Sequence, residues 1–245
     1  MKLLIDIGNS FVKFGIDNGR GTIEDISNIV YENEDALKKI VFNYLKTHSF
    51  SSAILVSVSI EINFQNFYPN SKIFCFDHQL PIPIQNLYAT PHTLGIDRLA
   101  AALGGYSLYP NSELLIIDAG SAITIDRLTA NADFIGGNIS PGIRMRFKSL
   151  NTFTKRLPLI EDFKLYESDF GKSTHHALNH GVIFGVVYEL ESYVQRFHDA
   201  YPVGKVILTG GDAEYLHKIL KLNVEVNKNL VFLGLSKALD YNLRN

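Results

Sequence analysis

The sequence has one cysteine, no run of basic residues and no long apolar stretch, and each shortage excludes a class of protein. The single Cys75 cannot form an internal disulfide, and its apolar surroundings in KIFCFD predict a buried thiol in a reducing cytosol. The net charge of −2 argues against a nucleic-acid partner. Apolar runs stay below the roughly 18 residues of a membrane span, and MKLLID reaches an acidic residue too early for a signal peptide. We expect a soluble cytoplasmic protein, with no membrane or nucleic-acid partner, that binds a small molecule.

Two short segments of ESDFGKSTHH match kinase motifs, but the surrounding sequence lacks the other residues that those motifs need. Gly171–Thr174 spells the end of a P-loop, but a P-loop requires glycine five residues before its Gly-Lys pair, and Tyr166 stands there. Asp169–Gly171 spells the metal-binding tripeptide of protein kinases, but no His-Arg-Asp loop or Gly-rich loop precedes it. The sequence therefore argues against both a P-loop protein and a protein kinase.

One pattern occurs twice. LLIDIGNSFVKFGID near the N-terminus and LLIIDAGSAITIDRL from Leu114 each predict an apolar strand ending in Asp, a Gly two residues later and a second strand. Asp6 and Asp118 are too far apart in the chain for a solenoid repeat, so the pattern indicates two related halves. Strands followed by helices in both halves predict an α/β protein with two similar lobes, 1–112 and 113–245, and a ligand in the cleft between them.

Other segments complete this pattern. Helical spacing is clear in NEDALKKIVFNYLKTH behind an Asn33 cap, in DRLAAALGGYSLY and in ALNHGVIFGVVYELESYVQRFHDAY. The segment PIPIQNLYATPHTLG is too rich in proline for a helix or a central strand and predicts a surface loop. FIGGNISPG predicts a glycine turn before an amphipathic run from Ile143 to Leu157. KVILTGG predicts a further strand, followed by two closing helices.

Three places in the sequence have residues suited to phosphate chemistry. In each repeated turn, Gly lets backbone N–H groups approach an oxyanion, and the Asp can hold a cation that bridges phosphates. One Asp-x-Gly hairpin alone is more simply an Asx-type turn, but two copies that end buried strands favour function. In LGIDRLAAAL, Asp97 suits the orientation of an attacking hydroxyl, and Arg98 offers a planar fork for a carboxylate. The simpler interpretation of that pair is a capping Asp beside a surface Arg.

The ordered set DIGNSFVK, LGIDR, DAGSAITID and GGNISPG resembles the type III pantothenate kinases, in the acetate-kinase, sugar-kinase, Hsp70 and actin superfamily. The resemblance runs from Lys2 to Leu239 and implies two similar actin-like (ribonuclease H-like) lobes with an inter-lobe cleft. It implies ATP-dependent phosphorylation of pantothenate to 4'-phosphopantothenate, the first step of coenzyme A biosynthesis. It further implies a homodimer, Mg²⁺ beside the nucleotide, and a monovalent cation, K⁺ or NH₄⁺.

The resemblance also assigns roles to residues. It implies that ATP lies against Asp6, Ile7, Gly8, Asn9, Ser10, Phe11, Val12, Lys13 and Ser121. It makes Asp97 the proton acceptor and Asp118 a ligand of the monovalent cation. It places pantothenate among Tyr88, Gly95, Ile96, Asp97, Arg98 and Thr174, the last often across a dimer interface. Ser121 departs from the usual Thr of the family but keeps the hydroxyl.

Several alternatives stay open at this point. A kinase of the same fold could act on another acceptor, although Arg98 favours a carboxylate-bearing substrate. A non-catalytic nucleotide-binding regulator is a third class, disfavoured because the residues with chemical roles are intact. The resemblance implies that the turn LTGGDA lies by the adenosine, with Gly210 and Gly211 as candidate contacts, and a plain strand-to-helix turn is an equally good interpretation. His176 and His180 share a helical face, and we favour surface or interface histidines over zinc because no third ligand is evident.

Overall fold

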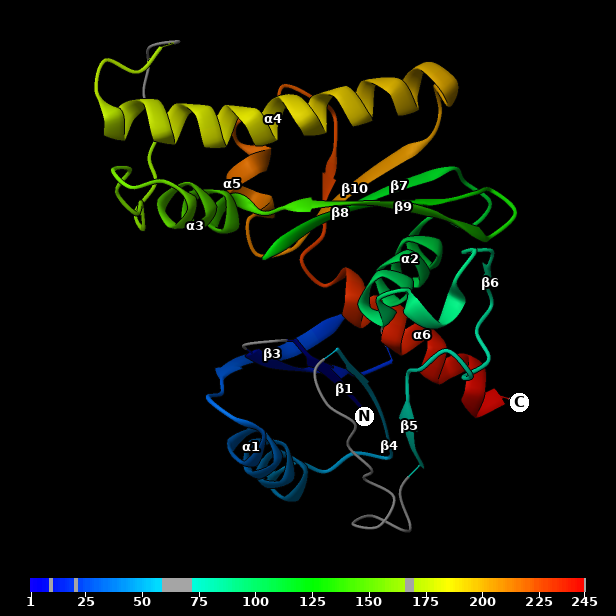
Figure 1. The fold of residues 1–245 in the computed structure, drawn as a ribbon. Helices are drawn as coiled ribbons and strands as arrows, with labels where there is room; N and C mark the ends of the chain where they lie inside the picture. Colours follow the sequence, from blue (N-terminus) through cyan, green and yellow to red (C-terminus); the bar gives the residue numbers. More distant parts are fainter. Residues whose placement is uncertain (9–10, 20–21, 59–71, 166–169, 245) are drawn as a thin grey trace. The chain divides into compact units, whose positions relative to one another are not determined.

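The computed structural model describes residues 1–8, 11–19, 22–58, 72–165 and 170–244. It is an α/β fold that divides into two compact units (Figure 1). The first unit comprises Met1–Ser112, Leu128–Gly136 and Asn229–Asn245, and the second comprises Glu113–Arg127 and Gly137–Lys228. These units differ from the expected lobes 1–112 and 113–245 because the last helix and one segment of the second half cluster with the first unit.

The first unit is built on a five-stranded sheet with the order β3-β2-β1-β4-β5. Its central strand β1 pairs antiparallel with β2 and parallel with β4. The strands are β1 (Lys2–Ile7), β2 (Phe11–Asp17), β3 (Ile23–Val30), β4 (Ser52–Ser57) and β5 (Lys72–Cys75). The direction of each neighbour follows from its connection. A short turn joins β1 to β2 and makes the pair antiparallel, whereas a helix precedes β4 and allows it to run parallel to β1.

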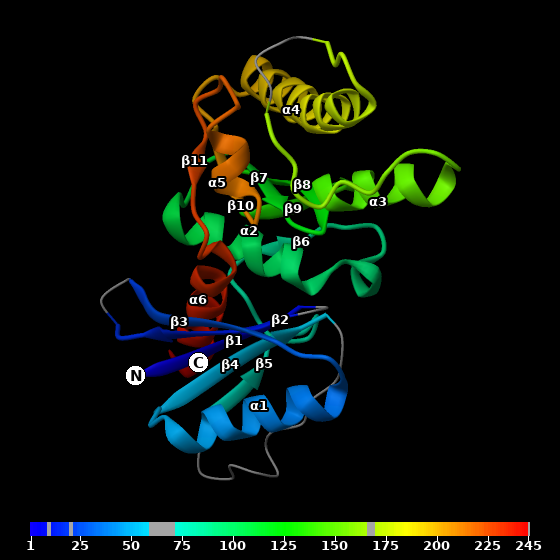
Figure 2. The same ribbon diagram turned by 90° about the vertical axis from the view of Figure 1, so that its left-hand side faces the viewer.

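Helices cover both faces of this sheet (Figure 2). Helix α1 (Glu34–Thr47) begins at Asn33, whose side chain accepts a hydrogen bond from the N–H of Ala36 at 2.9 Å, as predicted. Its buried side chains pack with alternate residues of β1, such as Ile5. Helices α2 (Ile96–Leu108) and α6 (Leu230–Arg244) pack against each other, and both contact β4.

The contact between α2 and α6 is close enough to need glycine on both helices. A Cβ atom on Gly104 would lie 2.0 Å from the carbonyl oxygen of Leu230, and one on Gly234 would lie 1.9 Å from that of Ala100. Such distances are far inside van der Waals contact, so the two backbones pack directly. The start of α2, which includes Asp97, is therefore fixed by a rigid helix pair.

The six-stranded sheet, of which Leu128 and the first residues of β9 cluster with the first unit, repeats the strand order of the five-stranded sheet. Strands β9-β8-β7-β10-β11 lie in the same sequence of neighbours as β3-β2-β1-β4-β5, and β7 pairs parallel with β10 as β1 does with β4. The elements are β7 (Leu114–Ala119), β8 (Ala122–Leu128), β9 (Asp133–Pro141), β10 (Lys205–Thr209) and β11 (Glu225–Val226), with helices α3 (Ile143–Phe153), α4 (Thr174–Ala200) and α5 (Ala213–His217). This shared topology is the structural basis of the sequence repeat.

The core of the second unit forms where helices α3, α4 and α5 meet the sheet. Apolar side chains of β7, β8 and β10 pack there with Phe147 of α3, a row of residues along α4 and Leu216 of α5. Helix α4 is the longest helix of the structure, with 27 residues. None of the helices in the described ranges combines the length and the apolar character needed to cross a lipid bilayer.

Two expectations about local structure were wrong. FIGGNISPG forms most of strand β9, not a turn. Its glycines serve close packing, because a Cβ on Gly137 would lie 2.2 Å from Oδ1 of Asp126, and Gly136 has a φ of 126° beside the ring of Tyr88. Cys75 is exposed, not buried, because β5 is the edge strand of its sheet.

The proline-rich loop from residue 81 to 95 has little regular structure, as expected. It contains a 3₁₀ turn, η1 (Pro91–Thr93), and a two-residue strand, β6 (Gln85–Asn86). That strand pairs parallel with the first residues of β9, which belong to the same unit. The pairing anchors the loop directly before Tyr88.

Candidate functional site

The first repeated turn joins β1 to β2. Asp6 and Lys13 are paired in the strand register, and the Lys13 Nζ atom lies 3.6 Å from Oδ2 of Asp6. The N–H of Gly8 donates to the carbonyl of Phe11 at 2.9 Å and closes the turn. Asn9 and Ser10, which the resemblance assigns to ATP binding, lie outside the described residues. The described part of the turn thus has a carboxylate and an ammonium group at one end of the hairpin.

The other ATP-assigned residues of this hairpin differ in exposure. Ile7 and Val12 are fully buried in the core below the sheet, whereas Phe11 is 43% exposed. A buried aliphatic side chain has no polar atom for a phosphate. Ile7 and Val12 can therefore offer a nucleotide only backbone groups.

The Asp6 carboxyl lies in the electric field of Asp97, the residue that the resemblance makes the proton acceptor. Burial raises the pKa of the Asp6 carboxyl above its ordinary value, the Lys13 ammonium opposes this rise, and the negative charge of Asp97 adds to it. A buried carboxylate in the field of a second carboxylate suits a site that binds cations or a phosphate–cation complex.

Asp97 and Arg98 lie in the first turn of α2, after Gly95 at the N-cap. The N–H of Arg98 donates to Oδ1 of Asp97 at 2.9 Å, which fixes the carboxylate against the helix start. Gly95 is required there, because a Cβ would lie 2.6 Å from the same oxygen. A helix N-terminus carries partial positive charge, so this position also favours a bound anion.

The Arg98 side chain is buried, unlike the surface arginine of the simpler interpretation. It is only 6% exposed, and its guanidinium carbon lies 5.7 Å from the centre of the Tyr88 ring. The ring of Tyr88 is next to that of Phe134, at 6.4 Å between centroids. Two residues that the sequence assigned to pantothenate are therefore neighbours in the first unit.

Tyr31 is a residue of this site that the sequence gave no reason to select. It follows β3, and its hydroxyl donates a short hydrogen bond to the carbonyl oxygen of Gly8. It lies in no motif and is far from the turn in sequence, so only the sheet order β3-β2-β1 reveals the contact.

The second repeated turn joins β7 to β8 in the other unit. Asp118 is paired in register with Thr209 at the end of β10, and a Cβ on Gly210 would lie 2.4 Å from Oδ1 of Asp118. Gly210 has a φ of 94°, a left-handed conformation that favours glycine. The Asp118 carboxylate therefore lies against the glycine turn of LTGGDA. Ser121 is exposed at the tip of its own turn.

The same glycine turn leads into α5 with an ion pair nearby. The N–H of Asp212 donates to the carbonyl of Ala119 at 2.9 Å, and its Oδ1 lies 3.1 Å from Nη1 of Arg144. Arg144 is 72% exposed, so this ion pair adds little stability. It places two charged groups beside the turn.

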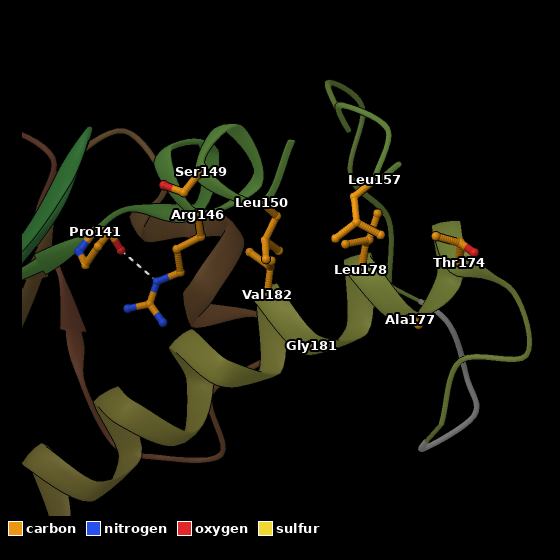
Figure 3. A pocket seen from close by; sticks show the side chains of 10 residues that line it. All are labelled: Pro141, Arg146, Ser149, Leu150, Leu157, Thr174, Ala177, Leu178, Gly181 and Val182. Atoms are coloured by element: carbon orange, nitrogen blue, oxygen red, sulfur yellow. Dashed lines mark hydrogen bonds between the residues drawn. The ribbon is translucent and has the colours of Figure 1, made fainter. Parts of the chain in front are cut away.

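Thr174 begins helix α4, where Ser173 is the N-cap and accepts from the N–H of His176 at 3.2 Å. Residues 161–165 form no strand, which fits the rejection of a P-loop. Asp169 lies outside the described residues. Thr174 is at one end of a pocket of about 590 Å³ between α3 and α4 (Figure 3). The pocket is lined by Pro141, Arg146, Ser149, Leu150, Leu157, Thr174, Ala177, Leu178, Gly181 and Val182.

The histidines after Thr174 lie in the first turns of α4. Within the described ranges, no group of three or more His, Cys, Asp and Glu residues is arranged to hold a metal ion. His176 and His180 instead begin a ladder of rings along α4, with 6.2 Å between their centroids and 4.2 Å from His180 to Phe184.

Comparison with solved structures defines the fold. A Campylobacter jejuni protein described as a conserved Baf family transcriptional activator matches 99% of this chain and 100% of its own, with a TM-score of 0.64 at 24% identity. A glucokinase from an Antarctic psychrotroph gives 0.55 at 11%, with 98% of both chains covered. The activator of 2-hydroxyisocaproyl-CoA dehydratase from Clostridium difficile, with bound ADPNP, gives 0.54 at 13%, covering 100% of this chain and 97% of its own. The fold is that of the actin-like ATPases and sugar kinases, which confirms the predicted fold class.

Comparison with curated sequences then defines the family. Residues 2–196 match the family model described as type III pantothenate kinase. The relatives include the type III pantothenate kinase of Porphyromonas gingivalis, at 40% identity with 98% of both chains covered. They also include that of Flavobacterium johnsoniae, at 35% identity with both chains covered completely. The chain belongs to the type III pantothenate kinase family, as the resemblance of its motifs implied.

Proposed function

We propose that this chain transfers the γ-phosphoryl group of ATP to pantothenate, with Asp97 as the residue that orients the acceptor hydroxyl and takes its proton. The activity is that of its family: ATP-dependent phosphorylation of pantothenate, which starts coenzyme A biosynthesis. The observation that supports the role of Asp97 is that its charge raises the pKa of the Asp6 carboxyl, because phosphoryl transfer needs the acceptor near the phosphate site.

The transition state of phosphoryl transfer is loose, so positioning matters more than a strong base. The hydrogen bond from the N–H of Arg98 holds one oxygen of Asp97 in place. The other oxygen is then suited to accept a hydrogen bond from the primary hydroxyl of pantothenate, and the proton passes to it late in the reaction.

Arg98 is proposed to bind the carboxylate of pantothenate. Its guanidinium is buried and stacked near Tyr88, so its direction is restricted. A planar fork with fixed direction matches a carboxylate in two-point fashion.

Two cations are proposed to accompany ATP. Carboxylate oxygens are the donors that Mg²⁺ accepts, and magnesium in nucleotide sites uses one or two of them together with the phosphates. Asp6 fits this pattern. Asp118, held against the Gly210 turn, is proposed to bind K⁺ or NH₄⁺. We expect turnover in K⁺ or NH₄⁺ but not in Na⁺ alone, and an Asp118→Asn variant that no longer responds to K⁺.

A homodimer with Thr174 acting across the interface is the proposed assembly. The aromatic ladder of α4 includes Tyr188, which is 63% exposed, so this face is available to a second copy. Mixing an Asp97→Asn chain with a Thr174→Ala chain tests the idea. If Thr174 serves the partner's site, mixed dimers contain one intact site and regain activity that neither variant has. Absence of any gain after exchange of subunits would contradict a shared site.

Acceptor choice distinguishes this function from its alternatives. Purified protein with ATP and Mg²⁺ should release ADP with pantothenate and not with glucose or acetate, and the reaction is expected to take place in the cytoplasm, where ATP is supplied. Turnover with glucose alone would assign the chain to another acceptor. The likeness to the Campylobacter protein, at 24% identity, concerns the fold and gives no ground for a role in transcription.

A further inference from the structure

Arg146 of α3 connects three segments of the second unit. Its Nε donates to the carbonyl oxygen of Pro141 at 2.8 Å (Figure 3). Its Nη2 lies 3.2 Å from the hydroxyl of Ser140 and also forms a short ion pair with Glu189 of α4. Because the donors of a guanidinium point in fixed directions, these contacts fix the end of β9 relative to both helices.

The environment of Arg146 makes this arrangement rigid. The side chains of Arg146 and Glu189 are only 22% and 24% exposed. On α4, Gly185 lies beside the guanidinium, and a Cβ there would be in ordinary van der Waals contact with Nη1, at 3.9 Å. A partly buried charge pair with further hydrogen bonds resists rearrangement, because loss of one partner leaves the other charge uncompensated.

The segment that Arg146 holds is in direct contact with the second repeated turn. Gly142 follows Pro141, and its N–H donates to the carbonyl of Ser121 at 3.1 Å. A Cβ on Gly142 would lie 2.3 Å from the carbonyl oxygen of Gly120 and 2.6 Å from that of Ser121. There is no space between the two backbones. A displacement of Pro141 and Gly142 must therefore displace Ser121.

We propose that Arg146 is a positioning residue for the phosphates of ATP, acting through Pro141 and Gly142 on the Ser121 turn without touching the nucleotide. This inference rests on the proposed function, in which Ser121 contacts those phosphates. Glu189, on a different helix, is then part of the same arrangement, because it accepts a hydrogen bond from Nη2 of the same guanidinium.

The test is ATP binding by the Arg146→Gln variant, measured without pantothenate. We expect the ATP dissociation constant to rise about tenfold, the loss expected when hydrogen bonds to a charged group are removed, with the KM for pantothenate within about twofold of wild type. Lys148→Gln is the matched control: it removes one positive charge from an exposed position of the same helix and should change neither constant. Glu189→Gln keeps the bond to Pro141 and should weaken ATP binding less, by about threefold.

A purely structural role for Arg146 gives a different result. Such a role lowers Tm and the active fraction while the ATP dissociation constant of the folded protein stays at the wild-type value, and that outcome overturns the inference. If Arg146→Gln does not fold, the Glu189→Gln variant supplies the same comparison, and unchanged ATP affinity in it is equally decisive.

A double-mutant cycle with Ser121→Ala tests the route of the effect. If Arg146 acts through Ser121, the combined variant loses less ATP affinity than the product of the two single losses. Independent, multiplying effects would contradict this route. Wild-type protein that binds ATP but does not phosphorylate pantothenate would refute the proposed function and leave the binding comparison valid. Wild-type protein that does not bind ATP would overturn both.

Discussion

The ammonium nitrogen of Lys13 lies 3.6 Å from the Asp6 carboxylate, across the first two strands of the sheet. Lys13 is 44% exposed and Asp6 only 16%, so the cation is mostly hydrated while the carboxylate is not. Burial consequently dominates, and the pKa of Asp6 is raised despite its partner. The site thus contains a carboxylate whose ionised form is disfavoured by burial and would be stabilised by a further cation.

Asp6→Asn is therefore expected to stabilise the protein while it removes activity. Because the pKa of Asp6 is raised in the folded state, the contribution of this carboxyl group to stability is fully present below its ordinary pKa of 3.8. That contribution is lost as the pH rises through the folded pKa, so at neutral pH the ionised carboxylate destabilises the fold. Thermal unfolding at pH 7 without nucleotide should show Tm higher by about 2–4 °C, the equivalent of 1 kcal/mol in a chain of this length.

Asp17 is the matched control for that change. Although burial opposes its ionisation, hydrogen bonds from Ser236 and the N–H of Gly19 and the ion pair with Lys2 hold the pKa of Asp17 below its ordinary value. Its contribution to stability is present above pH 3.8 and lost as the pH falls through the folded pKa. Asp17→Asn should lower Tm at pH 7 by roughly 6 °C or more. Equal shifts in both variants would refute this account of Asp6.

Tyr31→Phe should weaken ATP binding without affecting pantothenate. The change removes only the hydroxyl that donates to Gly8, so the first turn loses its tie to β3 while the packing of the ring remains. Steady-state kinetics should give a KM for ATP about fivefold higher, consistent with the loss of one hydrogen bond. Tyr106→Phe, on α2, is the control and should behave as wild type. An unchanged KM for ATP in Tyr31→Phe would show that the tie is unnecessary.

Arg98→Lys should raise the KM for pantothenate by more than about tenfold and leave that for ATP nearly unchanged. Lysine keeps the charge but lacks the planar fork and the stacking on Tyr88. Pantothenol, which has a hydroxyl in place of the carboxylate, is a useful second substrate. It should bind wild type and variant equally poorly. A proportional rise in both KM values would remove Arg98 as the carboxylate ligand.

Gly104→Ala should destabilise the first unit strongly, because the added Cβ would meet the carbonyl of Leu230 at 2.0 Å. Overpacking of this kind costs about 1–3 kcal/mol, occasionally more, and urea unfolding measures it. Gly181→Ala is the comparison: it too is a helical glycine, but a Cβ there meets nothing within 4 Å. It should stabilise by about 0.5–1 kcal/mol through helix propensity alone. Similar effects in both would contradict the direct backbone contact of α2 and α6.

Sequence patterns predicted much of this fold because they are local. Helix α1 behind Asn33 and the two hairpins at Asp6 and Asp118 follow from spacing, capping and repetition. The prediction of a turn in FIGGNISPG was wrong because its glycines allow close packing against neighbouring residues. No local rule distinguishes a glycine in a turn from a glycine needed for close packing. The prediction that Cys75 is buried was wrong for a related reason, because the sequence of an apolar strand does not show whether that strand lies at the edge of its sheet.

In the candidate site, too, the sequence predicted what local motifs carry and missed what depends on the tertiary structure. Motifs located Asp97 and Arg98, whose residue types suit their chemistry. Tyr31 and Arg146 act through backbone carbonyls, which any sequence supplies, so they leave no motif to recognise. Such contacts become visible only when the strand order and the helix packing are known.

The most direct test of the account is ADP release by the wild-type protein and by the Asp97→Asn variant, with ATP, Mg²⁺, K⁺ and pantothenate. Asn has almost the same shape and keeps an oxygen for the N–H of Arg98, but it cannot accept the hydroxyl proton. The account predicts turnover in the wild type, a loss of at least about a hundredfold in the variant, and nearly unchanged ATP binding in both. Wild-type turnover that persists undiminished in Asp97→Asn would contradict the central role given to this carboxylate.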